Sequence, residues 1–186
     1  MSKHTVLSLL LSVVLLASSA CSTQLEDNTP SVTYDFDSIG LYLARGSLTK
    51  TDFEQYKVFS KNLFFECGEI KGGENIPTQQ APALLTPTQQ KKIQGTATAL
   101  CEVLEDSNFT FAKQDPKHGI ANSGQLILDL SVNGKEYKIK TSVDSISNSK
   151  SLQEKKLRRL VEAIRGSTKT PPCGLKEFYG LGSSTN

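Results

Sequence analysis

The pair Asn133-Gly134 separates two segments in which apolar and polar residues alternate, as they do in strands with one buried face. Asn-Gly is the pair preferred in a type I′ turn, which joins two antiparallel strands through a two-residue loop. The residues that then face one another lie on one side of the ribbon: Leu126 and Thr141, Leu128 and Ile139, and Leu130 and Tyr137. Because this register agrees with the apolar pattern, the sequence predicts a β-hairpin over residues 126–141.

Two segments carry the signals of capped amphipathic helices. The first begins at Thr86-Pro87, with Gln89 at the capping-box position, and the second begins at Ser151, with Glu154 at that position and Gly166 at its end. Each has an apolar stripe: Ile93, Ala97, Leu100, Cys101 and Leu104 in the first, and Leu157, Leu160, Val161 and Ile164 in the second. Together with the hairpin, they predict an α+β fold in which two amphipathic helices pack on one face of an antiparallel sheet.

Shorter apolar runs indicate the remaining elements. The run Val58–Ile70 predicts one strand that could carry a bulge, and Asn108–Lys113 predicts a short strand. The runs Val32–Phe36 and Ile39–Leu43 are further candidate strands, and residues 114–123 are predicted as a loop.

The N-terminus has the organisation of an export signal. Lys3 gives it a positive start, and residues 6–16 form an apolar run too short to cross a bilayer as a permanent helix. Small residues follow and end at Cys21. This segment resembles the lipobox of bacterial lipoproteins, in which the chain is cut before a cysteine that becomes lipid-modified. Ser18 departs from the pattern, because the family prefers leucine at that position.

The resemblance implies that residues 1–20 are a signal peptide and that lipid on Cys21, palmitate included, holds the mature protein on a membrane. Residues 21–31 are polar and are expected to be a tether of ~30 Å when extended, followed by one globular domain over residues 32–186. Ser22 stands where the family's inner-membrane retention signal would be Asp, which favours the outer membrane. A plain secretory signal, with Cys21 unmodified, is the alternative.

With Cys21 assigned to lipid, three cysteines remain. Export places them in an oxidising compartment, where a disulfide persists. Cys101 lies in a helical apolar stripe, which is typical of a buried, inert thiol. The sequence favours a bridge between Cys67 and Cys173, closing a loop on the order of 100 residues and worth ~4–5 kcal/mol in the chain-entropy model. Another pairing, or no bridge, stays open.

Residues 72–85 are predicted as a long loop between a strand and a helix. Loops of this length, here with two prolines, are commonly binding elements. The alternative is a loop whose two leucines only cap the core. The candidate binding residues are Ile76, Gln79, Gln80, Leu84 and Leu85.

In arrangement, the stretch from Phe65 to Gly166 resembles the emfourins, small bacterial metalloprotease inhibitors. The shared outline is a strand followed by Gly72-Gly73, a helix start at Leu85-Thr86-Pro87, and then strands and a closing helix. The resemblance is one of topology, and no inhibitory residue is carried over. It implies an alternative function, inhibition of an envelope or secreted protease through residues 72–85.

The charges exclude one class of partner and leave another open. A formal net charge of +2 is far from the strongly basic surface of a nucleic-acid-binding protein. One helix nevertheless concentrates positive charge, either as a solvated face or as a contact for anionic lipid or an acidic partner. Its cations are Lys155, Lys156, Arg158 and Arg159.

The chain offers few residues for catalysis or metal binding. Beyond the signal its only histidine is His118, and it has no CxxC pair, P-loop or G-x-S-x-G motif. We therefore expect no catalytic residue, metal or cofactor. A hydrolase acting through Cys67 or Ser147 is a further alternative, because a cysteine paired with His118 could act as a nucleophile.

These observations predict a non-catalytic, lipid-anchored lipoprotein of the bacterial cell envelope that acts as a binding or structural module. The expected partners are the membrane, reached through the lipid on Cys21, and a protein whose identity the sequence does not indicate.

Overall fold

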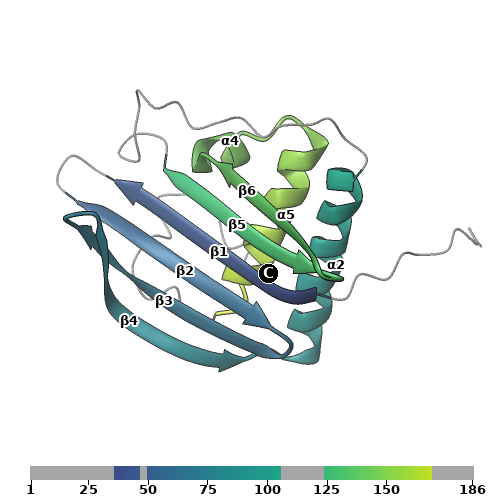
Figure 1. Cartoon of the computed structure of the whole chain (residues 1–186), viewed down its shortest axis with the longest axis horizontal. Coiled ribbons are helices and arrows are strands. Elements are labelled where there is room, and N and C mark those ends of the chain that lie inside the picture. The colour runs from purple at the N-terminus through teal and green to yellow at the C-terminus, as the bar shows by residue number, and fades with distance from the viewer. Residues whose placement is uncertain (1–35, 47–49, 106–123, 169–186) are drawn as a thin grey trace, which may run out of the picture. The chain divides into compact units, whose positions relative to one another are not determined.

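The computed structural model describes residues 36–46, 50–105 and 124–168. Their six strands form one antiparallel sheet in the order β4-β3-β2-β1-β5-β6 (Figure 1). The strands are β1 (Phe36–Gly46), β2 (Thr51–Phe59), β3 (Asn62–Lys71), β4 (Glu74–Leu84), β5 (Gln125–Val132) and β6 (Lys135–Thr141). Helices α2 (Pro87–Glu105), α4 (Val143–Ser147) and α5 (Leu152–Arg165) lie on one face of the sheet. The predicted α+β class is confirmed, with the short α4 as an addition.

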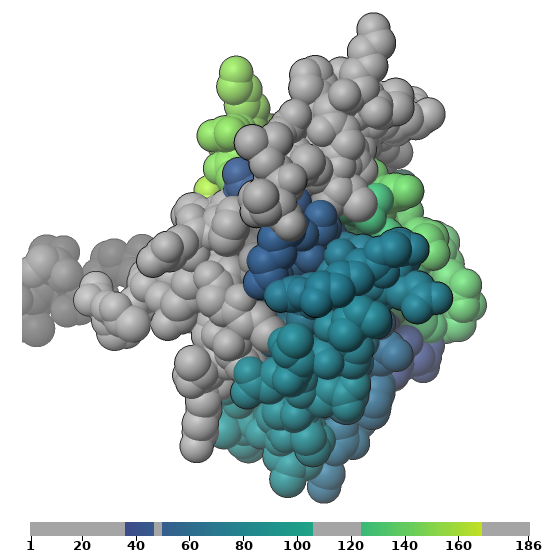
Figure 2. Space-filling view, turned by 90° about the vertical axis from the view of Figure 1, so that its left-hand side faces the viewer, coloured from purple at the N-terminus to yellow at the C-terminus, as the bar shows by residue number. Residues whose placement is uncertain are grey.

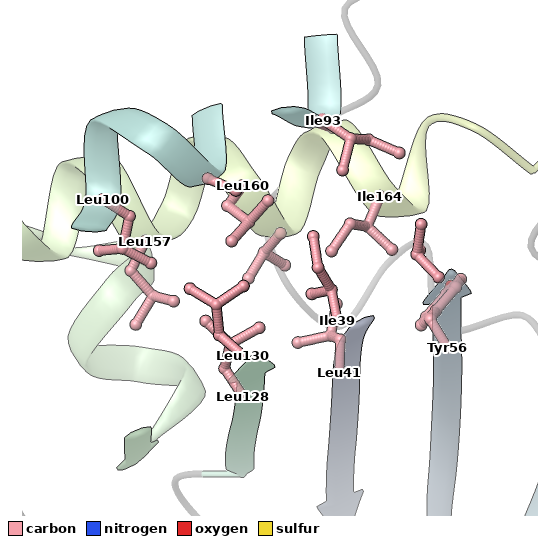
Figure 3. Packing of buried hydrophobic residues seen from close by; sticks show 14 of the residues in the cluster. Ile39, Leu41, Tyr56, Ile93, Leu100, Leu128, Leu130, Leu157, Leu160 and Ile164 are labelled. Atoms are coloured by element: carbon pink, nitrogen blue, oxygen red, sulfur yellow. The ribbon is translucent and has the colours of Figure 1, made fainter. Parts of the chain in front are cut away.

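The core lies between the helices and one face of the sheet, which we call the inner face; the opposite face is the outer face. Strand side chains point toward α2 and α5, whose apolar stripes meet them (Figure 3). The side chains in this layer are buried, among them Ile39, Leu41, Leu128 and Leu130 from the strands and Ile93, Leu100, Leu157 and Leu160 from the helices. Removal of this apolar area from water is the main stabilising contribution to the fold.

The predicted hairpin is confirmed as β5 and β6, in the predicted register. Leu130 faces Tyr137, Leu128 faces Ile139 and Leu126 faces Thr141. The two turn residues, Asn133 and Gly134, have φ values of 51° and 72°, the left-handed conformation that a type I′ turn requires.

Both predicted helix starts are confirmed. The Thr86 backbone N–H donates to Gln89 Oε1 over 2.9 Å, and the Gln89 N–H donates to Thr86 Oγ1 over 3.3 Å. The Glu154 N–H donates to Ser151 Oγ over 3.1 Å, and Glu154 accepts from the Ser151 N–H in return. These reciprocal bonds satisfy N–H groups that have no partner inside a helix.

The prediction of one strand over Val58–Ile70 is wrong, because the chain reverses inside it. β2 ends at Phe59 and β3 begins at Asn62, with Phe59 facing Asn62 across a two-residue turn. Ser60 supplies the left-handed conformation of that turn, with a φ of 54°. The turn was missed because its residues, Ser60 and Lys61, lack the Gly, Pro or Asn that usually marks a reversal.

At the N-terminal side, Ile39–Leu43 belongs to β1, which begins at Phe36, while residues 32–35 lie outside the described part of the chain. The predicted strand Asn108–Lys113 and the predicted loop 114–123 also lie outside it.

The prediction of a loop over residues 72–85 is wrong as well. Gly72 and Gly73, with φ values of 61° and 86°, form a turn, and β4 then runs back along β3 to Leu84. Its two prolines suggested a loop, but Pro77 and Pro82 are tolerated because β4 is an edge strand. In Figure 2 the teal atoms of β3 and β4 occupy the centre of this side of the molecule.

The β3–β4 hairpin bends over the outer face. β1 and β4 are separated by two strands, yet Tyr42 Oη donates to Asn75 Oδ1 over 3.2 Å. A flat sheet would hold the two strands ~14 Å apart, so the contact requires strong curvature. The register shift between Cys67 and Gly68, a β-bulge with Thr78 as the extra residue, lies where the hairpin bends.

Candidate functional site

A buried polar cluster links β2 to the C-terminal end of α5. Glu54 is fully buried and accepts from Arg165 Nε over 2.9 Å and from Nη2 over 3.2 Å. Tyr56 Oη donates to the same carboxylate over 2.8 Å. The three groups satisfy one another inside the inner layer, as a buried charge pair requires.

The protonation states in this cluster are fixed by burial and by charge. Burial, followed by the negative charge of Glu54, raises the pKa of Tyr56 far above its ordinary value. Burial alone would lower the pKa of Arg165, but the adjacent Glu54 carboxylate outweighs it and the pKa is raised. Tyr56 thus remains a neutral donor and Arg165 a cation, which suits a permanent structural link.

Sequence reasoning missed Glu54 and Arg165, although both have a signal. Arg165 follows Leu157 and Val161 at helical spacing, so it continues the apolar stripe of α5. Glu54 is two residues before Tyr56 on β2, so the two side chains share a face, and that face is the inner one. A charged residue on each of two buried faces is the pattern that indicates such a pair.

The two described cysteines differ in state. Cys67 is buried on the inner face, opposite Glu54, and is disulfide-bonded. Residue 173 lies outside the described residues, so the pairing of Cys67 with Cys173 stays a prediction. Cys101 is a free, buried thiol in α2. The same limit applies to lipidation at Cys21 and to His118, which also lie outside.

We expect Cys101 to resist alkylation in the native protein. Burial, with a contribution from nearby Glu105, raises the pKa of its thiol to about 11, so at pH 8 only about one thiol in a thousand is the reactive thiolate. Mass spectrometry after iodoacetamide treatment at pH 8 should show Cys101 unmodified in the native chain and alkylated in the unreduced chain in guanidinium. Rapid labelling of Cys101 in the native chain would contradict the burial of the apolar stripe of α2.

A hollow of about 560 Å³ lies over the outer face, where β1, β2, β5 and β6 meet. Gly40 forms its floor, because a residue without a side chain stands between Lys57 on β2 and Asp129 on β5. The side chains of Phe59 and Lys138 are part of the wall. The described helices cover the other face, so this hollow is a candidate binding site.

The hollow combines apolar contact with both signs of charge. Lys138 Nζ lies 3.3 Å from Asp129 Oδ1, and Lys57 is exposed at the opposite side of Gly40. Phe59 is 44% exposed, which is unusual for a phenylalanine on a folded domain. Such a lining fits a short polypeptide segment that brings an apolar side chain and a charged one.

The predicted binding residues of the 72–85 range are now placed on β4. Gln79 and Gln80 are exposed, as are Ile76 at 42% and Leu84 at 72%. Leu85 is different, because it is buried in the core and follows the strand. Their role in binding stays a prediction, but the predicted loop that was to present them does not exist.

The edge of β4 is poorly suited to pairing with another strand. Pro77 faces Gly68 and Pro82 faces Phe64, the positions at which an edge strand tolerates a missing N–H on its solvent side. The prolines interrupt the row of donors that an added strand would need. Contact with a protease through β4 would therefore depend on side chains.

The four cations predicted as an anionic contact belong to α5 but differ in exposure. Lys155 and Arg159 are exposed and Lys156 is partly buried. Arg158 is engaged within the chain, donating to Glu162 Oε1 over 2.8 Å and to the Ser147 carbonyl over 3.0 Å. The Ser147 hydroxyl donates to the Val143 carbonyl inside α4.

A comparison of the chain with protein-family models finds no match, and a search of curated proteins finds no significant relative. None of the helices in the described ranges is both long and apolar enough to cross a membrane. Over the same ranges, no three or more His, Cys, Asp or Glu residues are grouped to hold a metal ion.

Proposed function

We propose that this protein is a non-catalytic lipoprotein of the bacterial cell envelope, anchored by lipid on Cys21, whose outer sheet face binds a protein partner. The export signal and lipobox support the anchor, and Ser22 supports placement at the outer membrane. The hollow over Gly40 is the observation that carries the binding part of the proposal.

The reactive groups of the inner layer support a non-catalytic role. Cys67 is held in a disulfide, which removes its nucleophilic thiolate. Glu54 is fully engaged by Arg165 and Tyr56. The Glu54–Arg165 pair links the sheet to α5. The inner layer is thereby accounted for by structural roles, which leaves the outer face as the surface that can present a binding site.

The proposal predicts that filling the hollow stops partner capture without harm to the fold. A photoreactive residue replacing Lys138, which lines the hollow, should crosslink a protein in intact cells, whereas one replacing Lys155 on α5 should not. Gly40→Val should reduce the crosslink about tenfold or more, the factor that corresponds to ~1.4 kcal/mol. The measurement is the yield of the crosslinked product, identified by mass spectrometry.

Gly40→Val also serves as its own folding control. A Cβ on Gly40 would meet Asp129 Cβ at 3.6 Å, an ordinary contact, and glycine inside a strand costs ~0.5–1 kcal/mol relative to alanine. We therefore expect the variant to fold, and its thermal unfolding beside that of the wild type checks this. An unchanged crosslink in a folded Gly40→Val protein, or equal capture from position 155, would show that the hollow is not the binding site.

A further inference from the structure

Apolar side chains gather at one corner of the outer face. Phe59 faces Asn62 on β3, and Asn62 faces Leu84 on β4, so two exposed large apolar side chains flank one residue. Phe59 is 44% and Leu84 72% exposed. Together with Phe64 and Pro82, which face each other beside them, they form what we call the apolar corner.

The segments that build the apolar corner carry positive charge only. Residues 57–65 and 75–101 contain no Asp or Glu. Beside Phe59 they hold the exposed lysines Lys57 and Lys61, and α2, which packs on the inner face, carries the exposed Lys91 and Lys92. Lys61 is also close to the start of α2, because its carbonyl accepts from the Leu85 N–H over 2.9 Å. An exposed apolar group framed by lysines is complementary to an anionic bilayer surface.

The chain enters the sheet at the same end as the apolar corner. β1 begins at Phe36, and its residue Ile39 faces Val58, directly before Phe59. Fifteen peptide bonds join Cys21 to Phe36, so this stretch reaches at most about 50 Å. An anchor at Cys21 therefore keeps this end of the sheet within about 50 Å of the membrane.

We infer that the apolar corner rests on the membrane surface, with Phe59 and Leu84 in the headgroup region and the neighbouring lysines on anionic headgroups. The inference rests on the proposed lipid anchor and adds an orientation to it. The anchor limits the domain to one membrane surface, and the apolar corner selects which side of the domain faces it. The hollow over Gly40 adjoins Phe59, so a partner bound there would lie beside the bilayer.

The orientation can be tested with single tryptophans, because the chain contains none. Full-length lipidated protein carrying Phe59→Trp or Leu84→Trp is reconstituted into phosphatidylglycerol vesicles whose acyl chains are brominated. Ile76→Trp is the matched control, since Ile76 is 42% exposed and faces Glu69 near the opposite end of the sheet. Leu152→Trp, at an exposed position on α5, reports on the cationic patch of that helix.

We expect the emission of Trp at 59 and 84 to shift to shorter wavelength and to lose more than half its intensity. The emission of Trp at 76 and 152 should stay as in unbrominated vesicles. Adding Lys57→Glu and Lys61→Glu to Phe59→Trp should abolish most of the quenching, because each lysine near an anionic surface contributes about fivefold to binding. High salt should act in the same direction.

Two outcomes would overturn the inference while leaving the anchor intact. Equal quenching at all four positions would show an unoriented domain, and quenching only at 152 would show that the α5 cations face the bilayer. No quenching at 59 and 84 in protein that floats with the vesicles would equally reject the apolar corner as the contact. Failure of the anchor itself is recognised separately: the protein would not co-float with the vesicles in a density gradient, and mass spectrometry would find no acyl group on its N-terminus.

Discussion

Replacing Arg165 with methionine is expected to destabilise the fold by about 3–5 kcal/mol, a large part of the stability of a domain of this size. The loss is large because Glu54 stays fully buried in the variant while its carboxylate loses both hydrogen bonds from the guanidinium group. Tyr56 alone cannot compensate a buried negative charge, because it donates a single hydrogen bond. Equilibrium unfolding in guanidinium, followed by far-ultraviolet circular dichroism under non-reducing conditions, measures the change.

A double variant separates the value of the pair from the cost of breaking it. Glu54→Leu combined with Arg165→Met replaces both charges by apolar groups and should recover most of the lost stability. Arg159→Met on the exposed side of the same helix is the matched control and should change the free energy of unfolding by less than about 0.5 kcal/mol. A loss below about 1 kcal/mol for Arg165→Met would mean that water reaches Glu54, against the closed packing described above.

The elements that sequence reasoning predicted correctly are those whose signals are local. Asn133-Gly134 dictates its own turn and thereby the register of β5 and β6. Ser151 and Glu154 are three residues apart, and their capping box needs no other part of the chain. In both cases a short segment contains the donor, the acceptor and the backbone conformation that define it.

The features that were missed depend on residues far apart in the chain. Glu54 and Arg165 are separated by 111 positions, so neither local pattern shows that the other charge is there. The 72–85 range looked like a loop because its prolines and polar residues lack strand periodicity, whereas pairing with β3 holds it extended. For an edge strand, the neighbour supplies the order that intrinsic propensity does not.

The functional predictions also divide into those that depend on a local pattern and those that depend on residues far apart in the chain. The predicted export signal is a local pattern, and the location that we propose from it needs no reference to the fold. The hollow over Gly40 requires four strands, β1, β2, β5 and β6, to meet. The apolar corner depends on β2 and β4 lying on either side of β3, which places Phe59 and Leu84 on the two sides of Asn62. Leu84 was a candidate binding residue from the sequence, but Phe59 was not, because no spacing in the sequence connects the two.

Gly68 and Gly95 are expected to respond to alanine with opposite signs. A Cβ on Gly68 would clash with the Ile76 carbonyl oxygen and lie 2.8 Å from Pro77 Cα, so the backbone of β4 would have to move. We expect Gly68→Ala to cost about 3 kcal/mol or more, because rigid backbone cannot yield as a flexible side chain does. A Cβ on Gly95, in the interior of α2, meets nothing within 4 Å, and Gly95→Ala should gain ~0.5–1 kcal/mol.

Thermal unfolding of the two variants and wild type provides the comparison, with an expected fall of about 6–12 °C for Gly68→Ala and a rise of about 1–4 °C for Gly95→Ala. Hydrogen exchange then locates the damage. If the β-bulge sets the bend of the β3–β4 hairpin, the amides of β4 should lose protection in Gly68→Ala while those of β5 and β6 keep theirs. Wild-type stability for Gly68→Ala would show that β4 does not approach β3 closely at this position. In that case the curvature that brings Asn75 to Tyr42 would need another cause.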